Sequence, residues 1–367
     1  MIDLCERVPP YVRAIAPYQP GKPIAELERE LGITQAVKLA SNENPRGTSP
    51  RALRRVADEL GSLARYPDGN GFELKAALAQ RWGVERERIV LGNGSNDVLD
   101  LVARTFLVPG ASSVYAQHSF AVYALVTQAC GAFGVQVPAR AYGHDLPAMA
   151  AAIRPDTRVV FLANPNNPTG TFLPADALQA FLRQVPREVL VVLDEAYGEY
   201  LPQHLRMASE RWLAEWPNLI VVRTFSKAYG LAGLRVGYGL AHPEVADLLN
   251  RVRQPFNVNS LALGAAAAAL EDVSFIEESF ALNQAGLAQI SEGVDRLGLS
   301  HIPSVGNFVA IRVGDGARVY QALLRAGVIV RPVANYEMPE YLRVTVGLEE
   351  ENARFLRALE KTLEELA

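Results

Sequence analysis

Short apolar runs alternate along the chain with segments of helical periodicity. Six such runs are expected as strands at residues 88–91, 113–116, 158–163, 189–193, 219–223 and 236–240. Several are apolar throughout, as strands covered on both faces are. Strands separated by helices are typical of an α/β fold with a mostly parallel sheet. Polar or glycine-rich residues follow each run, so the pattern predicts a ligand site at the carboxyl edge of the sheet.

The pattern changes after about residue 250. A long helical stretch is followed by runs expected as strands at residues 308–313, 328–333 and 341–346, with a helix between them. This arrangement is typical of a smaller α+β domain. We therefore predict an amino-terminal arm over residues 1–36, a large ligand-binding domain over residues 37–249 and a small carboxyl-terminal domain over residues 250–367.

Composition narrows the class of partner. Hydrophobic residues make up 49% of the chain, and the net charge is −4 without any basic run, which argues against nucleic acid or an anionic membrane as the main partner. Cys5 and Cys130 form no disulfide framework, and the five histidines are scattered, so no metal site is expected. The longest run of small apolar residues, 261–270, is too short to span a bilayer. No signal peptide is recognisable, and we expect a cytoplasmic protein that acts on small molecules.

The distribution of lysine is unusual. Lysine and arginine total 36, yet lysine occurs only at residues 22, 38, 75, 227 and 361. Between Lys75 and Lys361 the single lysine is therefore Lys227. An amine can lose its proton and act as a nucleophile, whereas a guanidinium cannot. Chance composition is the alternative, and the residues around Lys227 decide between the two.

The segment LGNGSND, residues 91–97, joins a predicted strand to a predicted helix. Ser95 and Asn96 are candidates for a phosphate cradle, because free backbone amides at the start of a helix attract an anion. A dinucleotide fingerprint is a competing interpretation, but its third glycine position holds Asp97. A plain helix cap without a ligand stays open.

Two further segments place polar groups at the same edge. NPNNPTG, residues 164–170, carries Asn167, whose amide can donate to a phenolate oxygen or can stabilise a turn. VVLDEAY, residues 191–197, places Asp194 at the end of an apolar strand, with Tyr197 three residues later. A buried carboxylate needs a cationic partner. The partner can be a ligand or a structural arginine, and capping of the next helix is the third possibility.

The segment VVRTFSKAYGLAGLRVGYG, residues 221–239, contains the isolated lysine. Thr224, Ser226 and Arg235 are suited to a phosphate, and Lys227 stands among them; a surface loop is the alternative. Taken together, the segments call for a ligand with a phosphate, a basic ring nitrogen, a phenolic oxygen and an aldehyde. Pyridoxal phosphate carries all four groups.

The motifs NPNNPTG, DEAY and SKAYGLAGLR resemble those of the fold-type I pyridoxal-phosphate aminotransferases. Further segments resemble the histidinol-phosphate aminotransferases within that class, over nearly the whole chain. They are APYQPG (16–21), KLASNENPRG (38–47), YPDGNG (66–71), GNGSNDVLDL (92–101), RQPFNVNSLA (253–262) and YLRVTVG (341–347). The implied fold is a large domain with a mostly parallel mixed sheet flanked by helices, plus a smaller α+β carboxyl-terminal domain.

The resemblance also implies roles for single residues. Lys227 would carry the cofactor and move the substrate proton, and Asp194 would keep the pyridine nitrogen protonated. Asn167 and Tyr197 would bind the phenolic oxygen of the ring, and Phe120 would stack on the ring face.

The implied phosphate site draws on residues of three segments and on a second subunit. The residues implied to bind the phosphate are Ser95, Asn96, Thr224, Ser226 and Arg235, and Tyr66 would reach the phosphate from the partner subunit. A homodimer with shared active sites follows from the last of these roles. For the substrate, Arg343 would bind the carboxylate or phosphate, helped by Arg331 and Tyr18, with Asn167 also in contact. Surface salt bridges are the alternative for the two arginines.

The expected reaction is a reversible ping-pong transfer of an amino group in histidine biosynthesis. L-Histidinol phosphate and 2-oxoglutarate would give imidazole-acetol phosphate and L-glutamate. An aromatic amino-acid aminotransferase and a threonine-phosphate decarboxylase are alternatives with the same fold and cofactor. A regulator that only binds the cofactor is the non-catalytic alternative.

Overall fold

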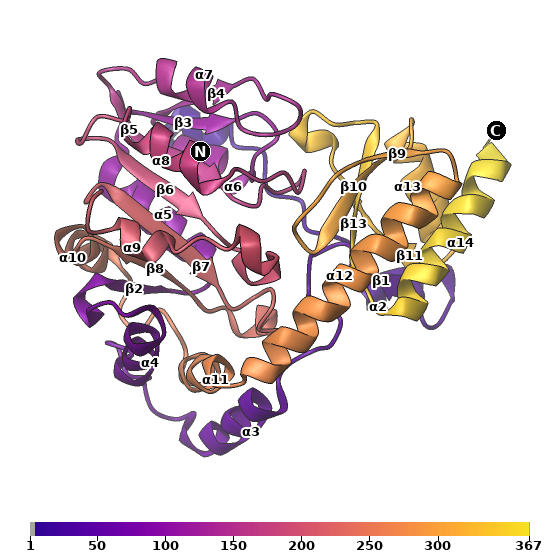
Figure 1. Ribbon diagram of the computed structural model, residues 1–367, viewed down its shortest axis with the longest axis horizontal. Coiled ribbons are helices and arrows are strands. Elements are labelled where there is room, and N and C mark those ends of the chain that lie inside the picture. Colours follow the sequence, from indigo (N-terminus) through magenta and orange to yellow (C-terminus); the bar gives the residue numbers. More distant parts are fainter. Residues whose placement is uncertain (1–3, 367) are drawn as a thin grey trace.

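The computed structural model describes residues 4–366, which form two lobes (Figure 1). The larger lobe is built on a seven-stranded sheet of order β2-β8-β7-β6-β5-β3-β4. Its strands are β2 (Ile89–Gly92), β3 (Ser112–Ala116), β4 (Phe133–Val137), β5 (Thr157–Ala163), β6 (Leu190–Asp194), β7 (Leu219–Thr224) and β8 (Gly237–Ala241). All pairings are parallel except the two that β8 makes. The predicted mostly parallel mixed sheet is confirmed.

Helices cover both faces of this sheet. One face carries α5 (Ser95–Phe106), α6 (Val122–Ala129) and α10 (Pro243–Val252). The other carries α3 (Pro50–Glu59), α4 (Phe72–Trp82), α7 (Leu146–Ala151), α8 (Ala175–Leu182), α9 (Ser209–Trp212) and α11 (Ser260–Leu270). Val191 and Val192 are adjacent in β6 and belong to the two opposite cores. This double burial explains why β6 carries four consecutive apolar residues, Leu190 to Leu193, before Asp194.

The smaller lobe contains an antiparallel sheet of order β12-β13-β10-β9. Its strands are β9 (Ser300–Ile302), β10 (Phe308–Arg312), β12 (Arg331–Pro332) and β13 (Tyr341–Thr345). The helices of this part are α12 (Val273–Arg296), α13 (Gly316–Arg325) and α14 (Glu349–Leu366). Near the amino terminus lie α1 (Pro10–Arg13), α2 (Ile24–Leu31) and β1 (Val37–Lys38), and β1 pairs in parallel with β11 (Val328–Ile329).

Two expected elements differ from the structure. The run 328–333, expected as one strand, is divided at Val330, because β11 pairs with β1 whereas β12 pairs with β13. β4 was not expected, since it lies at the sheet edge and its residues are mostly exposed. The domain boundaries after residues 36 and 249 stay a prediction; α11 lies beyond the second boundary and packs against α3 and α4.

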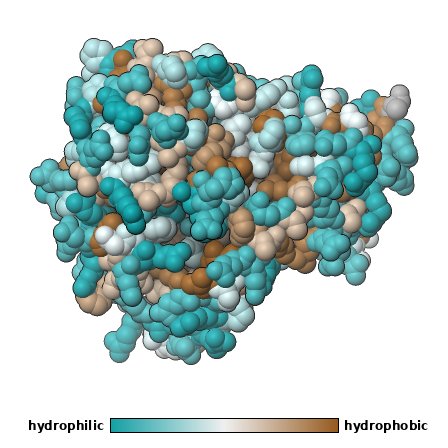
Figure 2. Space-filling view, viewed as in Figure 1, coloured by the Kyte–Doolittle hydropathy of each residue, from teal (hydrophilic) through white to brown (hydrophobic). Residues whose placement is uncertain are grey.

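The surface between the lobes differs from the rest of this face of the molecule. Figure 2 shows mainly hydrophilic residues, with apolar residues gathered where the two lobes meet. Within residues 4–366, no helix combines the length and the apolar character that crossing a bilayer requires.

Candidate functional site

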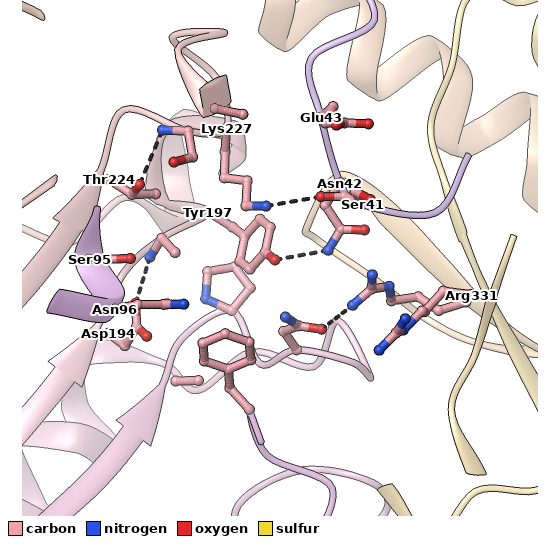
Figure 3. Close-up of a pocket in the computed structure, with 18 of the residues that line it drawn as sticks. Ser41, Asn42, Glu43, Ser95, Asn96, Asp194, Tyr197, Thr224, Lys227 and Arg331 are labelled. Carbon is pink, nitrogen blue, oxygen red and sulfur yellow. Dashed lines mark hydrogen bonds between the residues drawn. The ribbon is translucent and has the colours of Figure 1, made fainter. Parts of the chain in front are cut away.

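A cavity of about 260 Å³ lies between the lobes, at the carboxyl edge of the large sheet (Figure 3). Asp194 and Thr224 are the last residues of β6 and β7, and Ser95 is the first residue of α5. Arg331 and Arg343 reach the cavity from β12 and β13 of the small sheet. The parallel strands bring residues far apart in sequence to one edge, and the second lobe closes the site.

The structure brings all but one of the predicted site residues to the wall of this cavity. They are Tyr18, Ser95, Asn96, Phe120, Asn167, Asp194, Tyr197, Thr224, Ser226, Lys227, Arg235, Arg331 and Arg343. The exception is Tyr66.

Lys227 directs its amine into the cavity from the segment that follows β7 (Figure 3). Its Nζ donates a hydrogen bond to the backbone carbonyl of Ser41 over 3.1 Å. Burial, assisted by the positive charge of Arg343, lowers the pKa of Lys227 to about 8. A substantial fraction of the amine is therefore unprotonated at mildly alkaline pH, which is the form that attacks an aldehyde.

Asp194 is a buried carboxylate, with 5% of its surface exposed. The Tyr123 hydroxyl donates to its Oδ2 over 2.9 Å, and the backbone N–H of Ala196 donates to Oδ1 over 3.2 Å. Burial raises the pKa of Asp194 to about 6. No salt bridge joins it to a lysine or arginine within residues 4–366, so the structural-arginine alternative is wrong. A cationic group of a ligand would supply the charge that this carboxylate lacks.

The phosphate candidates form a cradle at the start of α5. The guanidinium of Arg235 donates to Ser226 Oγ over 3.1 Å, and Thr224 Oγ1 accepts from the Ser226 backbone N–H over 3.1 Å. Gly94 precedes Ser95 with φ of +85°, and a Cβ at Gly94 would lie 2.3 Å from Arg235 Nη2. The positive φ favours glycine at this position, and a methyl group here would displace the Arg235 guanidinium. The result is a cluster of donors at a helix N-terminus, which suits an anion.

The two arginines of the small sheet are held by neutral partners. Arg343 is buried, and its Nη1 donates to Asn167 Oδ1 over 2.5 Å. Arg331 donates to the carbonyl of Gln19 over 2.6 Å, and its guanidinium lies 5.5 Å from the centre of the Tyr18 ring. Nε of Arg343 is buried without a hydrogen-bond partner among the described residues. Neither Arg331 nor Arg343 forms a salt bridge with another described residue, so the salt-bridge alternative considered for them is not what the structure shows.

Comparisons with known proteins agree with this geometry. The family described as aminotransferase class I and II matches residues 34–359. The chain is 61% identical over 366 residues to "Histidinol-phosphate aminotransferase 2" of Nitrosospira multiformis, covering 99% of this chain and 93% of that one. It is 62% identical to "Histidinol-phosphate aminotransferase" of Methylobacillus flagellatus, covering 99% of each chain. The chain belongs to the class I and II aminotransferases.

A solved structure supports the same family assignment for this aminotransferase. The crystal structure of histidinol-phosphate aminotransferase from Sinorhizobium meliloti, in complex with pyridoxal-5'-phosphate, superimposes with a TM-score of 0.91. The sequences are 30% identical, and the match covers 98% of each chain. The predicted fold-type I architecture and the predicted resemblance to the histidinol-phosphate aminotransferases are both confirmed.

Tyr66 lies outside the cavity of the aminotransferase. It is 82% exposed, and its ring stacks on Phe256 with the centroids 4.7 Å apart. Within one chain it therefore does not reach the phosphate cradle. Its predicted role needs a second subunit and stays a prediction.

Sequence reasoning did not single out Tyr123 and Asn42, which line the cavity and form hydrogen bonds with other residues of the site. Tyr123 is fully buried against Phe161 and donates to Asp194. Asn42 is also buried, and its side-chain amide donates to the Tyr197 hydroxyl over 2.8 Å. The available signals were the place of Asn42 in the KLASNENPRG segment and the spacing of Tyr123, three residues after the predicted stacking residue.

Proposed function

We propose that this aminotransferase catalyses the reversible transfer of an amino group between L-histidinol phosphate and 2-oxoglutarate, with pyridoxal 5'-phosphate as cofactor. The products are imidazole-acetol phosphate and L-glutamate, and the reaction serves histidine biosynthesis. One observation carries the proposal. The Lys227 amine and the buried carboxylate of Asp194, which has no salt bridge to another described residue, lie in the same cavity. The names of the 60%-identical relatives agree with this substrate.

The residues at the cavity fit the proposed cofactor at each of its polar groups. The cradle of Ser95, Ser226 and Arg235 suits the phosphate, and Asp194 suits a protonated ring nitrogen. When bound, pyridoxal phosphate supplies an aldehyde that joins to amines and a ring that takes up electrons from the substrate Cα. Lys227 Nζ would hold that aldehyde and would serve as the base that takes up and returns the proton of the substrate Cα.

Asp194 and Tyr197 would act on two different polar groups of the ring, the nitrogen and the phenolic oxygen. A cationic ring nitrogen beside Asp194 would lower the pKa of this carboxyl and hold it in its anionic form, which in turn would keep the proton on that nitrogen. Burial raises the pKa of Tyr197 to about 12, so its hydroxyl keeps its proton and can act as a donor. Asn167 offers a neutral amide to the same ring oxygen, and Phe120 lines the cavity as the stacking surface.

Arg343 and Arg331 provide the anion site for both substrates. A planar guanidinium binds either a carboxylate or a phosphate with two parallel hydrogen bonds. The same pair can therefore hold the phosphate of histidinol phosphate in one half-reaction and a carboxylate of 2-oxoglutarate in the other. Tyr18, whose ring lies beside Arg331, would complete the substrate site from the amino-terminal arm.

A comparison of substrates tests the proposed reaction. Turnover is measured with histidinol phosphate, phenylalanine and threonine phosphate, each with 2-oxoglutarate. We expect the highest kcat/KM for histidinol phosphate, with glutamate formed in equal amount. Higher kcat/KM for phenylalanine would favour the aromatic aminotransferase, and release of carbon dioxide from threonine phosphate without consumption of 2-oxoglutarate would favour the decarboxylase.

The proposal includes a homodimer in the cytoplasm, in which Tyr66 reaches the phosphate of the other subunit. Its support is the exposure of Tyr66 and of Leu63 and Phe72, which are apolar side chains near it in sequence. Mixing Tyr66→Phe subunits with Lys227→Ala subunits tests the shared site. Sharing of Tyr66 predicts that mixed dimers contain one site with both changes and one site with neither, so the mixture should be more active than the average of the two parent proteins; activity equal to that average would contradict it.

A further inference from the structure

Asn42 connects the two lobes at the cavity. It is 1% exposed and has φ of +55°, a left-handed conformation that asparagine tolerates better than most residues. Its side chain contacts Tyr197, which follows β6, and Thr345, the last residue of β13. The side-chain amide of Asn307 donates to the backbone carbonyl of Asn42 over 3.0 Å. Asn42 is thus fixed at both its backbone and its side chain.

The hydrogen bonds around Asn42 determine which way its amide points. The backbone N–H of Asn42 can only donate, and it donates to Thr345 Oγ1 over 2.9 Å. The Thr345 hydroxyl has one hydrogen, and the acceptor for it among the described residues is Asn42 Oδ1, 3.0 Å away. With the amide oxygen bound there, the Nδ2 group of Asn42 faces the Tyr197 oxygen at 2.8 Å (Figure 3).

We propose that Asn42, oriented by Thr345, is a positioning residue that directs the hydroxyl proton of Tyr197 into the cavity. The Tyr197 oxygen accepts a hydrogen bond from Asn42, so its own hydrogen has no acceptor in that direction. The inference rests on the proposed function, because the acceptor it assigns to this proton is the phenolic oxygen of bound pyridoxal phosphate. Thr345, in the small lobe, thereby sets through Asn42 the polarity of a contact in the large lobe.

The consequence is an effect on the titration of the bound cofactor. The absorbance of pyridoxal phosphate bound to Lys227 changes when the lysine-derived nitrogen loses a proton. The anionic ring oxygen beside that nitrogen stabilises the protonated form of the nitrogen. A hydroxyl that donates to the ring oxygen reduces this stabilisation and lowers the pKa of the nitrogen. Loss of the donor should therefore raise the pH at which the absorbance changes.

Asn42→Asp reverses the polarity of the contact without changing the size of the side chain. A carboxylate has no hydrogen to donate, so it would accept the Tyr197 proton and withdraw it from the ring oxygen. We expect the absorbance midpoint to rise by about 1 to 2 pH units, the range given by a hydrogen bond to a charged group. The new negative charge also raises the midpoint, and a double-mutant cycle separates the two effects.

In that cycle Asn42→Asp is measured with Tyr197 present and in a Tyr197→Phe background. The charge acts in both backgrounds, whereas the direction of the hydroxyl proton matters only where Tyr197 is present. We therefore expect a clearly smaller shift in the Tyr197→Phe protein. Equal shifts in the two backgrounds, or no shift in either, would overturn the inference.

Thr345 provides a second test that adds no charge. Thr345→Val removes the hydroxyl that orients the amide and should raise the absorbance midpoint, whereas Thr345→Ser retains the hydroxyl and should restore the wild-type value. Thr362→Val makes the same change at a buried position in α14 and controls for packing. A Thr345→Val protein that titrates as the wild type, or as the Thr362→Val control, would contradict the role of Thr345.

These results are separable from failure of the proposed function. If purified wild-type protein binds no pyridoxal phosphate and shows no such absorbance, the proposed function itself is wrong. If the wild-type protein binds the cofactor and titrates while both sets of variants leave the midpoint unchanged, only the role of Asn42 and Thr345 is rejected.

Discussion

The buried carboxylate of Asp194 predicts a distinctive pH dependence of stability for the cofactor-free protein. Its pKa is about 6 in the folded chain, raised from 3.8 by burial. Folded protein therefore binds the proton more tightly than unfolded protein between these values. The stabilisation by the protonated group is fully present below about pH 4 and is lost as pH rises through about 6.

The magnitude follows from the size of the shift. Each unit of pKa difference corresponds to about 1.4 kcal/mol, so the difference between 3.8 and about 6 corresponds to about 3 kcal/mol. Asp194→Asn removes this titration. We expect the fall in unfolding free energy between pH 4 and pH 7 to be about 2 to 3 kcal/mol smaller in the variant, because pH 4 already lies just above the unfolded-state pKa.

The assay is urea unfolding of the cofactor-free wild-type and Asp194→Asn proteins at several pH values. The groups whose pKa Asp194 also raises, Lys227, Tyr123 and Tyr197, titrate mainly above this pH range, so the difference between the two curves is attributed to Asp194. Glu364→Gln, which removes a carboxylate from a residue of α14, serves as the control. Identical pH slopes for wild type and Asp194→Asn would refute the view that this carboxylate is buried without a cation. Saturating pyridoxal phosphate should reduce the slope of the wild type, because it supplies that cation.

Three further substitutions probe the contacts around the cofactor and the substrate. Tyr123→Phe removes the donor to Asp194 and should weaken binding of pyridoxal phosphate about tenfold in an equilibrium titration; unchanged affinity would remove Tyr123 from the site. Gly94→Ala places a methyl group against Arg235 and should lower the affinity for the cofactor and for inorganic phosphate together, whereas a loss confined to catalytic rate would contradict the cradle. Arg343→Lys keeps the charge but loses the planar fork, so KM should rise at least about tenfold for both histidinol phosphate and 2-oxoglutarate, and an unchanged KM for both would place this residue outside the anion site.

The large sheet could be predicted from sequence because its central strands are unusual in composition. β6 and β7 are buried on both faces, so their apolar runs are continuous and end at a polar residue. β4 lacks this signal, because it has a neighbour on one side only and its residues are mostly exposed. The division between β11 and β12 depends on partners far away in the sequence, which a local pattern does not contain.

The same distinction applies to the site. Lys227, Asp194 and Asn167 lie in short motifs whose residue types state their chemistry, and the structure brings them to one cavity. Tyr123 and Asn42 act through other side chains, and only the three-dimensional contacts show which group each one meets. Sequence therefore located the groups that face the ligand more readily than those that orient them.

Covalent trapping tests the central claim most directly. The yellow protein is purified with its cofactor, reduced with borohydride, digested and mapped by mass spectrometry, and Lys227→Ala protein is treated in parallel. The account predicts a single pyridoxyl label, on Lys227, and no label in the variant. A label on another lysine, or an unlabelled wild-type protein, would contradict it.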